Sequence, residues 1–244
     1  MSDSDADTRQ SLREAGDPFE PPFDSARLST MRRMVGRRMQ ESKRDAPHFY
    51  LAVEVDLEAL EAWRKREPES LSVNDCVLKA AALALRVAPA LNSRIVGDEV
   101  RTFKHVNLAF AVALAEGLVT PVLREADRLT LREIATQVRA LVTQARGRKL
   151  SPDDCRGGTF TVSNLGMLGI DAFYAIVNPP QSGILALGRA TPRPVVRAGS
   201  LAIATTMMAT LSADHRAIDG ATGAAFLGEL RRLLETPHEL WGTP

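Results

Sequence analysis

LSADHRAIDG, residues 211–220, is the stretch in which one kind of structure gives way to another. Before it, alternating apolar residues predict a strand over Leu201–Ser212, and after it, helical spacing predicts a helix from about Asp219 to Leu234. His215 therefore lies in a connection, where catalytic side chains are often displayed. A single histidine of this kind is more often structural than catalytic, although histidine suits a general base near neutral pH. Asp219 also has a simple interpretation, because aspartate is a favoured N-cap.

Upstream of this segment, the spacing of apolar residues predicts several more helices and strands. The expected helices cover Thr30–Lys43, 57–67, a stretch that begins at Ser72 or Asn74 and runs through Ala88, and 129–149 with Thr130 as its cap. The expected strands are 48–56, Ser93–Val96, Val100–Phe103, 106–114, 118–124, 159–163, Ser182–Gly188 and Pro194–Arg197. Helices and strands do not alternate strictly, so the sequence predicts an α+β fold, a two-layer sandwich of a mixed β-sheet with helices.

A second segment of interest, GGTFTVSNLGMLG, covers residues 157–169 and places Ser163 at the end of a β-rich run. A hydroxyl there could donate a hydrogen bond to a developing oxyanion, and Gly166 and Gly169 would let a ligand approach the backbone. An ordinary turn serine is the simpler interpretation. The segment lacks the GxSxG elbow of serine hydrolases, and its glycine spacing does not match the dinucleotide-binding or phosphate-loop fingerprints.

The composition argues against several classes of protein. The 244 residues have a formal net charge of +1, which gives no reason to expect nucleic acid or an anionic membrane as a partner. No apolar run reaches the roughly 18 residues that a membrane helix needs, and the acidic N-terminus lacks the apolar core of a signal peptide. Cys76 and Cys155 are not spaced as a zinc site or a disulfide framework. We therefore expect a cytoplasmic protein without a metal site, in which Cys76 is a buried core thiol.

Two regions are expected along the chain. Residues 1–27 are polar and acidic and contain three prolines near their end, which is typical of a disordered tail, although a short docking peptide for a partner fits the same composition. Residues 28–244 are expected to form one domain, because a chain of this size buries enough of its surface to hold a core.

The motif DHRAIDG, residues 214–220, resembles the DHRxxDG signature of the dihydrolipoyl acyltransferases. These enzymes form the core of 2-oxo acid dehydrogenase complexes and share the signature with chloramphenicol acetyltransferase. Five further blocks resemble the same catalytic domain in the same order: MRRMVGRRMQESKRDAPHFYL (31–51), VNDCVLKAAALALR (73–86), LAEGLVTPVLREAD (114–127), GGTFTVSNLGMLGI (157–170) and AIVNPPQSGILALG (175–188). The resemblance covers about residues 27–244 and implies a chloramphenicol acetyltransferase-like fold.

The resemblance implies an enzyme that moves an acyl group directly between a dihydrolipoyl thiol and coenzyme A. His215 would be the general base that takes the thiol proton, and Ser163 would hydrogen-bond the tetrahedral oxyanion. Asp219 would form an ion pair with Arg38 that holds the loop carrying the histidine. The substitution Asp219→Asn is then expected to damage folding or site geometry more than the proton transfer.

The resemblance also implies the acyl carriers. Coenzyme A is expected to contact Asn164 and Gly166, and the basic stretch RRMVGRR is either the solvated face of a helix or a contact for the coenzyme phosphates. Only about 27 residues precede the catalytic domain, too few for a lipoyl domain, so the lipoyl group is expected to come from another protein. A truncated chain and a different acyl carrier are the alternatives. Acetyl is the expected acyl group, followed by branched-chain acyl and then succinyl.

In such enzymes the active site lies between the subunits of a trimer, with histidine and serine contributed by facing chains. The expected assembly is therefore a homotrimer or a larger cage of trimers, and the expected partners are a lipoyl-domain protein and other components of a 2-oxo acid dehydrogenase complex. Two alternatives belong to other classes: a non-catalytic structural core subunit, and a coenzyme A-dependent acetyltransferase that acts on a hydroxyl acceptor.

Overall fold

The computed structural model describes Phe19 and residues 21–67, 70–114 and 117–241. Its internal contacts divide the chain into two units, residues 1–35 and residues 36–244, and the fold is that of the second unit. The predicted disordered tail, residues 1–27, lies mostly outside the described residues. Its described part, Phe19 and residues 21–27, contains no helix or strand.

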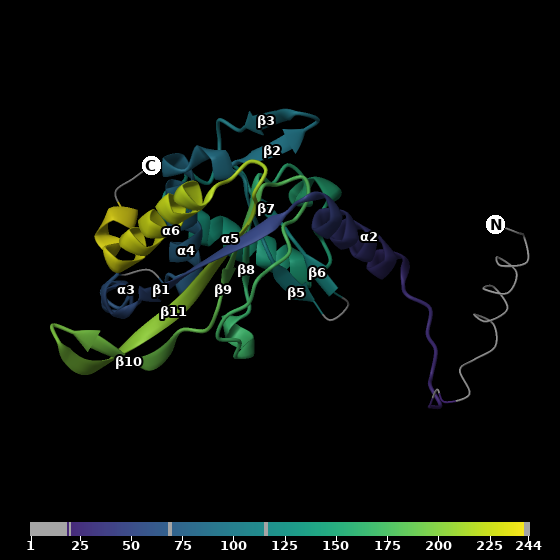
Figure 1. Cartoon of the computed structure of the whole chain (residues 1–244). Helices are drawn as coiled ribbons and strands as arrows, with labels where there is room; N and C mark the ends of the chain where they lie inside the picture. Colours follow the sequence, from purple (N-terminus) through teal and green to yellow (C-terminus); the bar gives the residue numbers. More distant parts are fainter. Residues whose placement is uncertain (1–18, 20, 68–69, 115–116, 242–244) are drawn as a thin grey trace, which may run out of the picture. The chain divides into compact units, whose positions relative to one another are not determined.

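The helices and strands follow one another in the order shown in Figure 1. The described α-helices are α2 (Thr30–Asp45), α3 (Glu58–Arg64), α4 (Val73–Val87), α5 (Leu131–Arg146) and α6 (Gly220–Glu235). The strands are β1 (His48–Asp56), β2 (Ser93–Val96), β3 (Glu99–Thr102), β4 (Leu108–Phe110), β5 (Val112–Leu114), β6 (Gly117–Val119), β7 (Val122–Leu123), β8 (Phe160–Asn164), β9 (Gly183–Leu187), β10 (Thr191–Arg197) and β11 (Ser200–Asp214).

A mixed sheet forms the centre of the fold. Its strand order is β1-β11-β9-β8-β4-β7. Strand β11 is long enough to pair with two strands along one edge: β9 pairs with its C-terminal part and β10 with its N-terminal part. β11 is antiparallel to β1 and to β9, whereas β8 is parallel to β9 and to β4. Two further pairs, β2 with β3 and β5 with β6, are separate small sheets. A mixed sheet with packed helices confirms the predicted α+β class.

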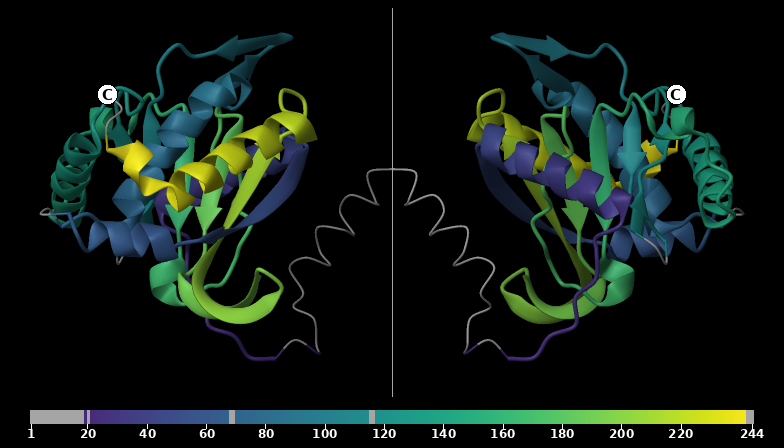
Figure 2. Two further views of the ribbon diagram at one scale, coloured as in Figure 1. Left: turned by 90° about the vertical axis from the view of Figure 1, so that its left-hand side faces the viewer. Right: turned by 90° about the vertical axis from the view of Figure 1, so that its right-hand side faces the viewer.

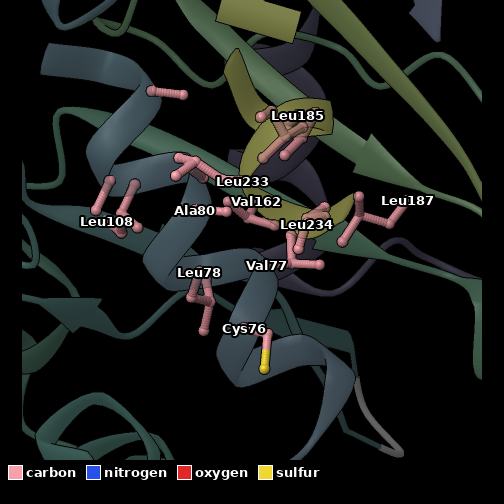
Figure 3. Close-up of a cluster of buried hydrophobic side chains, with 14 of the residues drawn as sticks. Cys76, Val77, Leu78, Ala80, Leu108, Val162, Leu185, Leu187, Leu233 and Leu234 are labelled. Carbon is pink, nitrogen blue, oxygen red and sulfur yellow. The ribbon is translucent and has the colours of Figure 1, made fainter. Parts of the chain in front are cut away.

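Helices α4 and α6 pack against each other and against the sheet (Figure 2). Apolar side chains of α4, of the C-terminal part of α6 and of the central strands meet in the core (Figure 3), and each such side chain that is fully buried contributes roughly 1.5–3 kcal/mol. Cys76 lies in this core, as expected, and burial raises the pKa of its thiol to about 12. Cys76 is therefore not a nucleophile near neutral pH.

Two of the predicted strands are interrupted, and that part of the prediction was wrong. The stretch 106–114 divides into β4 and β5, and the stretch 118–124 divides into β6 and β7 at Pro121. Proline has no N–H to donate to a ladder, although the carbonyl of Pro121 still accepts from the N–H of Phe110. The N–H of Ala111 donates to the carbonyl of Val162 in β8. The chain therefore leaves the main sheet here and forms the β5–β6 pair.

The helix starts follow the sequence more closely. Ser72 is the N-cap of α4, which decides between the two expected starts, and it forms a capping box with Asp75. Thr130 caps α5 as predicted, in a capping box with Glu133. Among the described residues, no helix is both long and apolar enough to cross a bilayer.

Candidate active site

His215 follows the last residue of β11, and its side chain is exposed. Its backbone N–H donates to the carbonyl of Pro47, 3.0 Å away, which ties the connection to the start of β1. Its imidazole packs against the ring of Phe49, with 4.5 Å between centroids and 54° between planes. Within the described part of the chain, neither ring nitrogen has a hydrogen-bond partner. The imidazole is thus accessible and both nitrogens are available for proton transfer.

The two residues that flank His215 lock its backbone. The carboxylate of Asp214 is almost fully buried and accepts from Arg216 at Nε (3.0 Å), at Nη2 (2.6 Å) and at the backbone N–H (3.0 Å). The backbone N–H groups of Ala217 and Ile218 donate to the carbonyl of Asp214. Sequence reasoning assigned no role to Asp214 or Arg216, although both belong to the DHR motif. Their contacts form a tight turn that presents the histidine.

Asp219 is the N-cap of α6, since its carboxylate accepts from the N–H of Thr222 at 2.8 Å. This backbone hydrogen bond is the main reason why the pKa of Asp219 lies below its ordinary value, and the positive charge on protonated His215 adds to the effect. The predicted ion pair with Arg38 is not formed among the described residues. Arg38 donates instead to the carbonyl of Pro179. The Asp219 carboxylate therefore has a hydrogen-bond donor within α6 and caps this helix without an ion pair to Arg38.

Ser163 lies near the end of β8 and is half-buried, and its hydroxyl has no hydrogen-bond partner in the part of the chain that the structure describes. Two hydrogen bonds of the next residue hold the loop that follows. The side chain of Asn164 accepts from the N–H of Gly166 at 2.8 Å and donates to the Asn74 side chain at the N-terminus of α4 at 3.4 Å. Asn164, expected to contact coenzyme A, therefore has both of its polar groups engaged within the chain.

Gly166 is held equally tightly. A Cβ at this position would lie 2.6 Å from the carbonyl oxygen of Gly188, in the connection between β9 and β10, and 2.9 Å from the Cα of Arg189. Gly188 in turn leaves no room, because its own Cβ would lie 1.8 Å from the carbonyl oxygen of Asp171. The small size of Gly166 thus lets the loop pack against the backbone of the neighbouring connection.

The sheet register separates Ser163 from His215 within one chain. Ser163 is level with Ala186 in β9, which is level with Thr210 in β11. His215 lies five positions beyond Thr210, or roughly 16 Å along the strand, and two strand spacings, roughly 10 Å, lie between β8 and β11. The two side chains therefore cannot act on one reacting atom within a single chain.

No cluster of three or more histidine, cysteine, aspartate or glutamate side chains suited to a metal ion occurs among the described residues.

The sheet and its helices have the architecture of the chloramphenicol acetyltransferase fold. Chloramphenicol acetyltransferase itself superposes with a TM-score of 0.53 at 15% identity, which shows the fold alone. The model of the family described as 2-oxoacid dehydrogenases acyltransferase (catalytic domain) matches residues 20–241. The chain belongs to this family.

Similar proteins come from bacteria and from yeast. The dihydrolipoyllysine-residue acetyltransferase component of the pyruvate dehydrogenase complex of Zymomonas mobilis is 42% identical over 225 residues, which cover 89% of this chain and 51% of that protein. The mitochondrial component of Schizosaccharomyces pombe is also 42% identical, over 89% of this chain and 47% of its own length. The chain thus spans about half the length of the curated relatives it matches.

Solved structures agree along nearly the whole chain. A probable dihydrolipoamide acetyltransferase of Listeria monocytogenes superposes with a TM-score of 0.81 at 32% identity and covers 91% of this chain and 96% of that one. The cubic core of a pyruvate dehydrogenase multienzyme complex gives a TM-score of 0.84 at 30% identity and covers 92% and 99%.

A third structure, of Azotobacter vinelandii dihydrolipoamide acetyltransferase, has a TM-score of 0.84 at 29% identity over 92% of this chain and 99% of that one. It is described as an investigation of the role of one serine, one histidine and one asparagine in the catalytic mechanism. In that protein the histidine follows the serine by 52 positions, and the asparagine follows the histidine by four. Ser163, His215 and Asp219 have the same spacing, with aspartate in place of asparagine.

Proposed function

We propose that this chain transfers an acyl group, acetyl first among the candidates, between a dihydrolipoyl thiol and coenzyme A. The observation that carries the proposal is the spacing of Ser163, His215 and Asp219, which repeats that of the three residues studied in the Azotobacter vinelandii acetyltransferase. The relatives from Zymomonas mobilis and Schizosaccharomyces pombe are named as acetyltransferase components of pyruvate dehydrogenase complexes, and these names favour acetyl over branched-chain acyl and succinyl.

The chemistry needs only the two side chains. His215 takes the proton from the attacking thiol, and the thiolate attacks the carbonyl carbon of the thioester. The carbonyl oxygen becomes an oxyanion that accepts a hydrogen bond from the Ser163 hydroxyl, and collapse of the tetrahedral intermediate expels the second thiolate, which takes the proton back from His215. Thiols have an ordinary pKa of about 8.5, so a positioned base supplies thiolate that is scarce at neutral pH and contributes about 10²–10⁴-fold.

The proposal requires more than one copy of the chain. Because Ser163 and His215 lie too far apart in one chain, each site would combine the histidine of one subunit with the serine of another, as in a homotrimer or a larger cage of trimers. Met167 and Leu168, next to the Ser163 loop, have exposed fractions of 82% and 67%, which suits a surface that another subunit covers.

Coenzyme A and a dihydrolipoyl group are the proposed acyl carriers, and the lipoyl group would reach the site from outside this domain. The proposed partners are the protein that carries this group and the other components of a 2-oxo acid dehydrogenase complex, in the cytoplasm.

Transfer from acetyl-coenzyme A to free dihydrolipoamide tests the proposal, with formation of the acetyl thioester as the readout. Isobutyryl- and succinyl-coenzyme A in parallel reactions rank the acyl groups. Hydroxylated acceptors test the alternative of transfer to oxygen. If no acceptor is acylated by the assembled protein, the enzymatic proposal fails and the chain is a structural core subunit.

A further inference from the structure

A histidine base works only when its ring is held in one orientation, and in many hydrolases a carboxylate bonded to the second ring nitrogen provides this. His215 has no such partner among the described residues. The nearby carboxylate of Asp219 is engaged with the N–H of Thr222 at the start of α6. The exposed imidazole therefore needs another source of orientation.

Strand β1 and the residue before it orient the imidazole of His215. Pro47, directly before the strand, accepts the backbone hydrogen bond of His215, and Phe49 packs its ring at 4.5 Å and a tilt of 54° against the imidazole. Phe49 is opposite Ala213 in the ladder between β1 and β11, two residues before the histidine. One short segment thus holds both the backbone and the ring plane of His215.

Helix α6 lies against the side of Phe49 at the position of Gly223. The Cζ of Phe49 lies 3.7 Å from the place that a Cβ of Gly223 would occupy, and the same Cβ would lie 2.6 Å from the Cδ1 of Leu51. A side chain at Gly223 would be in ordinary contact with the ring of Phe49 and would displace the end of Leu51, so α6 packs closely against this part of β1.

We infer that Phe49 is a positioning residue of the acyl transfer: it holds the imidazole of His215 in the orientation that accepts the thiol proton. The inference rests on the proposed function. Without the ring, the imidazole would sample the three staggered χ1 wells, which alone would lower the productive population about threefold. Misplacement of a catalytic group by about 1 Å costs on the order of 10²-fold. The loss expected on removing the ring therefore lies between about 3- and 100-fold.

The variants Phe49→Leu and Phe49→Ala test this inference, with Leu51→Val as the matched control. Leu51 is the next side chain on the same face of β1 and lies beside the same helix position, but it is opposite Leu211, four residues before His215. The variants Phe49→Leu and Phe49→Ala should lower kcat for acetyl transfer in that range, with alanine the more severe, while KM for both substrates stays within about twofold. Leu51→Val should leave kcat within about twofold even if its melting temperature falls.

Two outcomes would overturn the inference: a wild-type kcat in Phe49→Leu, or an equal fall of kcat in Leu51→Val at the same loss of thermal stability. If Phe49→Leu does not fold, Phe49→Met, which keeps a bulky side chain and removes the aromatic face, replaces it with the same expected results. The proposed function fails separately, since wild-type protein would then acylate no acceptor.

Discussion

His215 and Ser163 each have side-chain polar atoms without a hydrogen-bond partner among the described residues. His215→Ala should abolish transfer, because it removes the imidazole that takes the thiol proton in the proposed mechanism. Ser163→Ala should lower kcat by about 10²–10³-fold, the usual effect of removing one oxyanion donor, with little change in coenzyme A affinity. Steady-state kinetics on protein whose assembly is verified by light scattering provides the measurement. Retained activity in His215→Ala refutes the base assignment, and a pure binding defect in Ser163→Ala refutes the oxyanion role.

Asp219 shows how a structure changes a prediction for one residue. The expected ion pair made Asp219→Asn a damaging substitution, but asparagine caps a helix as well as aspartate does, and the Azotobacter protein has asparagine at the position with this spacing. We now expect Asp219→Asn to keep kcat within about threefold at neutral pH.

Acid unfolding gives a second readout of Asp219→Asn. The pKa of Asp219 is lower in the folded chain, so its ionised form adds stability above the ordinary value of 3.8, and that stability is lost as the pH falls through the lowered pKa. Asp219→Asn should lack this part of the acid dependence, and Asp219→Ala should also lose the cap. A collapse of the fold in Asp219→Asn at neutral pH would restore the ion-pair hypothesis.

Lys79, in the middle of α4, is among the largest fully buried side chains of the described residues, and its Nζ donates to the carbonyl of Leu129 at 2.7 Å. Burial lowers its pKa from the ordinary 10.5, and the nearby Asp127 partly opposes this effect. Between the lowered pKa and 10.5, the unfolded chain holds a proton that the folded chain has released. The free energy of unfolding should therefore rise with pH across this window.

Lys79→Met should remove that rise, and urea unfolding between neutral pH and pH 10.5 measures it. The exposed Lys65, at the end of α3, provides the control Lys65→Met, which should keep the wild-type slope. Equal slopes in wild type and Lys79→Met would show that burial does not perturb this lysine.

At the scale of elements, what the sequence predicted correctly depends on neighbours within a few positions. The caps at Ser72 and Thr130 need only a residue three positions on, and the DHR motif is a local turn. The division of the predicted strand 118–124 at Pro121 was missed, because whether a proline interrupts a strand depends on the neighbouring strand with which it pairs. The partner of Arg38 was missed for the same reason, since Pro179 is 141 positions away.

At the scale of the whole molecule, the fold class and family were predictable because six ordered blocks span the chain. The close packing of the Ser163 loop on the β9–β10 connection could not be predicted. It depends on Gly166, which follows β8, and Gly188, which follows the neighbouring strand β9, lying side by side. A Cβ at Gly166 would meet the backbone of Gly188 and Arg189, which no pattern within the loop itself predicts.

The division of the site between copies has a direct test. His215→Ala and Ser163→Ala are each expected to be deficient alone, but mixed assemblies would contain some sites that pair an intact histidine with an intact serine. Unfolding the two variants together and refolding them should restore about a quarter of wild-type activity at equal amounts in a closed symmetric oligomer. Separately refolded variants, mixed afterwards without exchange, are the control. No recovery in stable mixed oligomers would contradict the shared site.

The register that places Ser163 level with Thr210, five positions short of His215, also has a genetic consequence. A lesion in a self-contained enzyme silences only the copy that carries it. Here, under the proposed assembly, a chain that lacks both His215 and Ser163 would silence two sites. One site needs its histidine and the other needs its serine, and each also holds a side chain of an intact neighbour. Output would then follow the square of the intact fraction, and a null allele that still folds would be inherited as a dominant-negative trait.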